Sequence, residues 1–186
     1  MGKVSLGMTM SLDGFINDRS GSVQALYPDL AAWRETELGK ESIQDTGAVV
    51  MGRNSFDMAE DPDSIAENYE YQVPIFVLTH QPPKKHPKEN DDLTFTFVTD
   101  GIESAIGQAK AAAGDKDVTV IGAASIARQC LNQGLADELH VDIMPLLLGS
   151  GLRLFEDIGT ELIQLERLKV MELPSGRTHL RFRIIK

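Results

Sequence analysis

The chain has 186 residues, of which 42% are apolar and 25% are charged. This length and composition are typical of one compact globular domain, so we predict a single domain over residues 1–186 and exclude an extensively disordered chain. The formal net charge is -10, and no stretch of the sequence is strongly basic. A nucleic-acid partner is therefore not expected, and an anionic ligand would need a local cationic pocket to bind against the charge of the whole protein.

The cysteine content and the apolar segments exclude several further classes. Cys130 is the one cysteine, so no internal disulfide is possible, and its place in the predicted helix "SIARQCLNQGL" favours a buried, inert thiol. No CxxC pair or His-Cys cluster suggests a metal site. The first residues are typical of a strand and not of a signal peptide, and no segment is long enough to span a membrane. We expect a cytoplasmic protein without a membrane partner.

The first part of the chain is predicted to contain two strands with a helix between them. Residues 3–10 form a first strand that ends in the turn "SLDG". Residues 29–44 form an amphipathic helix in which Gly39 is a candidate break. Residues 48–51 form a short buried strand, and a further helix follows it.

The middle of the chain continues the alternation of strands and helices. Residues 73–79 form a third strand, and residues 80–87 form a surface loop because their three prolines exclude regular structure. Residues 93–100 form a strand with period-two character, and a helix follows over residues 100–114. Residues 117–122 form another apolar strand, which ends in a glycine.

The last third changes character. The apolar strand at 117–122 is followed by a helix with Ser125 as its candidate N-cap, which ends at Gly134, and then by a strand over residues 137–149. Residues 166–184 are typical of an antiparallel hairpin around the turn "PSGR". The alternation in its second strand places Leu180, Phe182 and Ile184 on the inward face and Arg181 and Arg183 on the outward face.

The order of these elements predicts the fold class. Strands that alternate with helices indicate a largely parallel sheet, and the terminal hairpin adds antiparallel strands at one edge. We therefore predict an α/β fold with three layers, α/β/α, around a mixed and mostly parallel central sheet.

The stretch "AVVMGRNSFDMAED", residues 48–61, places Arg53 where a buried strand meets a helix whose candidate N-caps are Asn54 and Ser55. Ligands of open α/β sheets bind at this edge, and helix N-H groups and a guanidinium together favour an anion. The alternative is that Arg53 is a surface ion-pair partner of the nearby acidic residues, which are Asp57, Glu60 and Asp61.

Three strand ends are expected to converge on one crevice. "MGRNS" offers hydrogen-bond donors, "VLTH" offers the hydroxyl of Thr79 and the imidazole of His80, and "VIGAAS" offers bare backbone N-H groups at a helix start. Such a crevice suits a dinucleotide, although close packing of helix against strand also requires small residues after Gly122. The chain has no G-x-G-x-x-G fingerprint with an acidic residue about 20 positions later. Arg53 favours NADP over NAD, because a positive group accommodates the extra phosphate.

The segments "SLDGFIND", "VVMGRNSF", "VLTHQP", "VIGAASIARQCL" and "ADELHVDIMPLLLGSGLRLF" resemble, in this order, the landmarks of the dihydrofolate reductase fold. They are most similar to the reductase domain of the bifunctional riboflavin-biosynthesis deaminase-reductase family. The resemblance covers nearly the whole chain and implies NADPH as cofactor and hydride transfer to a nitrogen heterocycle or an imine. The zinc-binding His and Cys signature of the deaminase half is missing.

The resemblance also implies which residues bind the cofactor. Thr9 and Ile16 would flank the nicotinamide. The adenosine phosphate end would contact Gly52, Arg53, Asn54, Ser55, Thr79 and His80, and the pyrophosphate would contact Gly122, Ala123, Ala124, Ser125 and Ile126.

Two departures from dihydrofolate reductases stand out. Those enzymes have paired glycines where this chain has Gly122 and Ala123. Their folate-anchoring acid has only a loose counterpart in Asp29, because the stretch from Asp29 to "MGR" is longer here.

Asp13 is the candidate catalytic residue. It follows the strand whose end is expected to face the nicotinamide, where a carboxylate can orient the acceptor or relay a proton. The alternative is that Asp13 and Gly14 only form a tight turn.

Three functions remain open at this stage. The first is an NADPH-dependent reductase resembling 5-amino-6-(5-phosphoribosylamino)uracil reductase, and the second is a reductase of dihydrofolate or another pteridine. The third is a nucleotide-binding protein without turnover. We also expect a homodimer, because the apolar hairpin leaves a sheet edge that needs cover, and the family resemblance implies the same.

Overall fold

The computed structural model describes residues 2–122, 124–159 and 161–186, which form an eight-stranded sheet in the order β4-β3-β2-β5-β1-β6-β8-β7. The strands from β4 to β6 in this order are parallel to one another, β8 is antiparallel to β6, and β7 is antiparallel to β8. The strands are β1 (Val4–Ser11), β2 (Thr46–Gly52), β3 (Ile75–Leu78), β4 (Phe95–Val98), β5 (Asp117–Ile121), β6 (Glu138–Met144), β7 (Gln164–Glu172) and β8 (Thr178–Ile185). The mostly parallel sheet with a C-terminal hairpin is confirmed.

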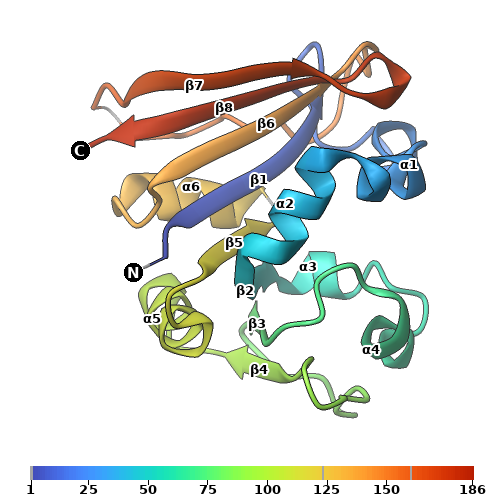
Figure 1. The fold of residues 1–186 in the computed structure, drawn as a ribbon, viewed down its shortest axis with the longest axis vertical. Coiled ribbons are helices and arrows are strands. Elements are labelled where there is room, and N and C mark those ends of the chain that lie inside the picture. Colours follow the sequence, from blue (N-terminus) through green and yellow to red (C-terminus); the bar gives the residue numbers. More distant parts are fainter. Residues whose placement is uncertain (1, 123, 160) are drawn as a thin grey trace.

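Helices cover both faces of the sheet (Figure 1). Alternate residues of β2 show this, because Val50 packs in the cluster that includes α5 and α6, whereas Val49 and Met51 pack with residues of α1, α2 and α3. The three-layer architecture is therefore confirmed. The helices are α1 (Leu30–Glu35), α2 (Glu37–Asp45), α3 (Arg53–Phe56), α4 (Ile65–Asn68), α5 (Ile102–Ala113) and α6 (Ala124–Asn132), with single 3-10 turns η1 (Gln24–Leu26), η2 (Pro62–Ser64) and η3 (Pro174–Gly176).

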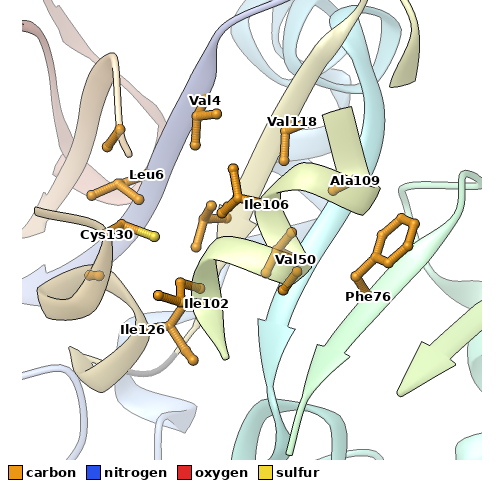
Figure 2. Close-up of a cluster of buried hydrophobic side chains, with 14 of the residues drawn as sticks. Val4, Leu6, Val50, Phe76, Ile102, Ile106, Ala109, Val118, Ile126 and Cys130 are labelled. Carbon is orange, nitrogen blue, oxygen red and sulfur yellow. The ribbon is translucent and has the colours of Figure 1, made fainter. Parts of the chain in front are cut away.

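The larger core lies between the sheet and helices α5 and α6 (Figure 2). Ile102 and Ile106 of α5 and Ile126 of α6 pack against apolar side chains of β1, β2 and β5. Cys130 of α6 is fully buried there, and burial raises the pKa of its thiol to about 12. The thiol is thus protonated at neutral pH, and the prediction that Cys130 is buried is confirmed.

The predicted helix over 29–44 is wrong in its continuity. The chain forms α1 and α2, and the break lies at Thr36 and not at Gly39. Thr36 has extended backbone, and its Oγ1 accepts a hydrogen bond from the N-H of Gly39 at 3.0 Å, so it caps α2. A Cβ at Gly39 would lie 2.3 Å from the carbonyl oxygen of Trp33, and the glycine is therefore required for the close approach of the two helices.

Three further boundaries differ from the prediction. Helix α3 begins at Arg53 with Gly52 as its N-cap and lasts one turn, so neither Asn54 nor Ser55 is the cap. Helix α6 begins at Ala124, so Ser125 lies inside it. The strand predicted over 137–149 ends at Met144, where Pro145 interrupts the ladder.

The hairpin has the predicted alternation with one exception. Phe182 and Ile184 pack against the larger core, and Arg183 is exposed and forms an ion pair with Glu166 at 2.7 Å. Arg181 does not face open solvent, because it lines a cavity on the opposite face of the sheet. Among the described residues, no helix has the length and apolar character needed to cross a membrane.

Candidate functional site

Three connections begin side by side at the carboxyl edge of the sheet. β2 lies between β3 and β5, and the registers extend to the last residues of these strands. The residues that follow the three strands are Arg53, Thr79 and Gly122. The structure therefore brings together the three segments that the sequence analysis expected to share a crevice.

Gly122 joins two of these segments directly. Its φ of +84° lies in the left-handed region, and a Cβ at this position would lie 2.0 Å from Oγ and 2.7 Å from Cβ of Ser55. A side chain is excluded here for both reasons, since such a distance is shorter than any normal contact. The turn after β5 is thus packed against the first turn of α3.

The side chain of Arg53 is hydrogen-bonded to α3 and to the loop after β3. Its Nε donates to both carboxylate oxygens of Asp57 at 2.8 Å, and its Nη1 donates to the carbonyl oxygen of Gln81 at 2.8 Å. The hydroxyl of Thr79 donates to the same carbonyl at 2.8 Å. This network fixes the loop after β3 against α3, while His80 and Asn54 remain exposed.

The start of α6 contributes mainly backbone to this edge. Ala124 and Ile126 are buried in the core, at 2% and 3% exposure, so their side chains face away from any ligand. Ser125 is exposed. The predicted contact of Ala123 lies outside the described residues.

Asp13 is held by three hydrogen bonds. Its carboxylate accepts from the hydroxyl of Ser11 at 2.6 Å and from the N-H groups of Leu148 at 3.1 Å and Gly149 at 2.7 Å. The bond from Ser11 is the main cause that lowers the pKa of this carboxyl, and the two N-H groups add to it. Asp13 thus links the turn after β1 to the loop after β6, and its catalytic role stays a prediction.

The two residues predicted beside the nicotinamide lie on different sides of the sheet. Thr9 of β1 is buried and lines the cavity. Ile16 packs against the larger core, and its N-H donates to the carbonyl oxygen of Leu152 at 2.9 Å.

The cavity lies between the sheet and helices α1 and α2. Its floor is formed by β1, β5, β6 and β8, and its apolar wall by Tyr27, Leu30 and Trp33. Ile121, the last residue of β5, also lines it. Because Gly122 follows Ile121, the cavity reaches the edge at which the three connections meet.

A buried charged cluster lies at one end of the cavity. Arg177 lies between two carboxylates, because its Nη1 donates to Asp142 at 2.9 Å and its Nη2 donates to Asp29 and to the carbonyl oxygen of Leu26. Nδ1 of His179 lies 2.7 Å from the other oxygen of Asp142. Nε2 of His179 and Oδ2 of Asp29 are buried and have no hydrogen-bond partner in the described structure. Unpaired buried polar atoms beside a cavity indicate a place for a ligand or water.

A second cluster borders the first. Burial opposes ionisation of Glu138, but hydrogen bonds from His140, Arg181 and Lys3 lower the pKa of its carboxyl to about 2. Burial also lowers the pKa of His140, against the effect of Glu138. The imidazole is therefore neutral at pH 7 and donates its Nε2 proton to Glu138 at 3.0 Å.

Of these two clusters the sequence analysis named only Asp29 as a candidate ligand contact, although a period-two signal was present in β6 and β8. Polar residues alternate in β6 and in β8, and the antiparallel register places the two sets on one face of the sheet. The local sequence indicates only a turn at the arginine of "PSGR" and a strand at the aspartate of "HVDI". The polar residues of this face are Glu138, His140 and Asp142 of β6 and His179 and Arg181 of β8.

Comparisons with known proteins agree with this architecture. Residues 2–178 match the family model described as the RibD C-terminal domain. The uncharacterized protein YyaP of Bacillus subtilis (strain 168) is 27% identical in an alignment that covers 94% of this chain and 90% of YyaP. A crystal structure from Shewanella sp. PV-4, whose name assigns it to riboflavin biosynthesis, has a TM-score of 0.77 at 21% identity and covers 99% of both chains. Dihydrofolate reductase from Enterococcus faecalis, complexed with NADP(H) and RAB-propyl, has a TM-score of 0.66 at 14% identity, covering 100% of this chain and 98% of that one.

Proposed function

Because this chain belongs to the RibD C-terminal domain family, we propose that it is an NADPH-dependent reductase that transfers hydride to a heterocyclic or imine acceptor. Its activity would then resemble that of 5-amino-6-(5-phosphoribosylamino)uracil reductase. The observation that carries this proposal is that the cavity and the sheet edge adjoin. The cavity beside β1 is lined by Ile121, and the next residue, Gly122, lies at the edge shared with Arg53 and Thr79. A cofactor along this edge and an acceptor in the cavity would be neighbours.

The residues at the edge fit a phosphorylated dinucleotide. Nη2 of Arg53 makes no hydrogen bond within the described chain, so it is available to a phosphate, and the first N-H groups of α6 point away from the helix body. Gly122 allows the backbone to turn at a φ that other residues rarely adopt. NADPH would supply the hydride when bound, while the protein orients the two reactants and excludes water.

The acceptor would lie in the cavity beside Thr9. Trp33 and Tyr27 provide aromatic surface for a planar ring, and the charged groups of β6 and β8 provide polar contacts on the floor. Asp13 remains our candidate for the chemical step. The reduced, unpaired Cys130 fits the cytoplasmic location that we propose for the protein.

Consumption of NADPH with a panel of acceptors tests the proposal. The panel contains pyrimidine and pteridine acceptors, and the loss of reduced nicotinamide absorbance is followed with NADPH and with NADH. We expect turnover of at least one acceptor, with NADPH preferred. NADPH binding without turnover of any acceptor would favour a non-catalytic nucleotide-binding protein, and turnover of dihydrofolate alone would favour the pteridine alternative.

A further inference from the structure

The cavity contains more carboxylates than cations. Its lining includes the guanidinium groups of Arg177 and Arg181 and the carboxylates of Glu41, Asp45, Glu70, Asp117 and Asp142. Whether the cavity can bind an anionic ligand therefore depends on whether either arginine is free of these carboxylates.

Arg177 is paired with two carboxylates through Nη1 and Nη2, and its buried Nε has no hydrogen-bond partner among the described residues. Its side chain is 3% exposed and lies between Asp29 and Asp142, with the carbonyl oxygen of Leu26 as a third acceptor. Removing this arginine from its two carboxylates would leave two buried charges without a partner, which is costly. The two carboxylates thus offset the positive charge of Arg177, so that this arginine adds no net positive charge to the cavity.

Arg181 is engaged in the same way. Its Nε donates to Glu138 at 2.8 Å, and its Nη1 lies 3.2 Å from Glu41, which is on α2 across the cavity. Among the residues that the structure describes, each cation of the lining is thus bound to two carboxylates. Of the other lining carboxylates, Glu70 pairs with Arg34 at 2.8 Å and Asp117 with Lys3 at 3.7 Å. Asp45 adds a carboxylate without an ion pair among the described residues.

A phosphate group is poorly suited to these surroundings. Near neutral pH it carries a charge of roughly -1.5 to -2, and phosphate sites supply guanidinium, ammonium or helix N-H donors to offset it. The cavity instead adds carboxylates in a partly desolvated space, where like charges repel strongly.

We propose that the acceptor of this cavity is a planar heterocycle that carries no phosphate, such as a free ribosylated pyrimidine or a pteridine. This inference rests on the proposed function, and it separates the chain from an enzyme that reduces a phosphoribosyl compound. The aromatic side chains of Trp33 and Tyr27 provide the stacking surface. The buried Nε2 of His179, which lacks a partner, provides a polar contact for a neutral ring.

Trp33 supplies a direct binding signal, because it is the one tryptophan of the chain and lines the cavity. Its fluorescence is titrated, without NADPH, with two matched pairs: 5-amino-6-(ribosylamino)uracil and its 5′-phosphate, and dihydroneopterin and its phosphate. We expect the member without phosphate to bind at least about tenfold more tightly, equivalent to about 1.4 kcal/mol, in one pair or both.

A variant of Glu41 tests whether the carboxylates of the lining cause the preference against phosphate. Glu41→Gln removes the negative charge opposite Nη1 of Arg181 and keeps an acceptor oxygen, so the preference against phosphate should narrow several-fold. Glu37→Gln removes the same charge from the same helix outside the cavity lining and should leave the preference unchanged.

Each outcome has a distinct meaning. Equal or tighter binding of the phosphorylated members, or no fluorescence change with any of the four ligands, would overturn the inference. Tighter binding of a dephosphorylated ligand that is never reduced by NADPH would support the inference while the proposed reductase activity fails.

Discussion

Arg53 is the residue on which the preference for NADPH depends in our proposal. We expect Arg53→Ala to weaken NADPH binding by about 1.5 to 3 kcal/mol, the range for a hydrogen bond to a charged group. NADH binding should weaken much less, because NADH lacks the extra phosphate. Isothermal titration with both cofactors measures the difference.

Asp57 provides a matched control for this prediction. Asp57 now accepts two hydrogen bonds from Nε of Arg53. Asp57→Asn removes a competing negative charge without removing the guanidinium, so NADPH affinity should stay the same or rise. Equal losses for NADPH and NADH in Arg53→Ala would contradict the assignment.

Asp13 is predicted to serve the chemical step more than cofactor binding. Asp13→Asn keeps the size and the turn preference but removes the charge. General acid-base or electrostatic roles typically contribute about 10² to 10⁴ in rate, so we expect a loss in that range. Single-turnover hydride transfer with an accepted substrate is the measurement, alongside NADPH affinity and melting temperature.

The hydrogen bonds of Asp13 make a second variant necessary. Asn17 anchors the same loop, because its side-chain oxygen accepts from the N-H of Leu152 at 2.8 Å. Asn17→Ala loosens the loop without removing a carboxylate. A similar loss of rate in both variants, or an unchanged rate in Asp13→Asn, would assign Asp13 to the turn.

At the scale of elements, the turn between β5 and α6 depends on Gly122. Gly122→Ala would force an alanine to a φ of +84° and place its Cβ against Ser55. We expect the free energy of unfolding to fall by about 2 kcal/mol, since left-handed strain and overpacking each cost about 1 kcal/mol or more. NADPH affinity should fall as well, because this turn forms the proposed cofactor edge.

Gly107 is the control for this change. It lies in α5, is exposed, and a Cβ there would meet no atom within 4 Å. Gly107→Ala should therefore raise the free energy of unfolding by about 0.5 to 1 kcal/mol. Urea denaturation of both variants measures the contrast, and an unchanged stability of Gly122→Ala would refute the packing argument.

Strand β6 is stabilised by the ionised carboxylate of Glu138. Because its pKa is about 2 in the folded protein and 4.5 in the reference state, this stabilisation is present above pH 4.5 and is lost as the pH falls towards 2. We expect Glu138→Gln to lower the free energy of unfolding at pH 7 by about 1.5 to 3 kcal/mol. The difference from the parent protein should shrink in acid.

Glu166 is the exposed counterpart for this test. It pairs with Arg183 at 2.7 Å, but both side chains are about half exposed, so Glu166→Gln should change stability by less than about 1 kcal/mol at any pH. Denaturant titrations at pH 7 and pH 3 compare the two variants. A loss in Glu138→Gln that is the same at both pH values would show that the carboxylate charge is not the cause.

The strands and the order of layers were predictable because apolar runs and their flanking turns are local signals. The run at 48–51 and the glycine of Gly122 identified strand ends that the register then placed side by side. The caps were less predictable, since Thr36 and Gly39 depend on how α1 meets α2. Such contacts are tertiary and leave no periodic pattern.

The buried polar face was predictable only in part. Alternation in β6 and β8 marks which residues share a face, but it does not show that α1 and α2 cover that face. Arg177 and Asp29 are 148 positions apart in sequence, and their pairing depends on the whole topology. Long-range pairs of this kind cannot be derived from local propensity.

At the scale of the whole molecule, the described sheet has two edge strands, β4 and β7, and β7 is the one that exposes large apolar side chains. β7 is the last strand in the order, and its apolar side chains Leu165, Leu168 and Val170 are 43%, 37% and 52% exposed. Exposed apolar edge strands promote association unless they are covered. We propose that two copies of the chain form a homodimer through this hairpin.

Val170 is the position at which this proposal is tested. Val170→Lys would place a charge in an interface that buries roughly 800 Å² on each partner in a typical stable dimer. We expect the parent protein to be a dimer at micromolar concentration and the variant to dissociate at least about tenfold more readily, because a desolvated charge without a partner is costly. Light scattering over a dilution series measures both.

Met58 supplies the control for the dimer. It is 54% exposed and follows α3 by two residues. Helix α3 lies away from β7 (Figure 1). Met58→Lys makes the same replacement of an exposed apolar side chain by a charge, and its association should match that of the parent. A monomeric parent protein at micromolar concentration would remove the proposal. Equal weakening by both variants would mean that the net charge of the molecule, and not the β7 edge, governs association.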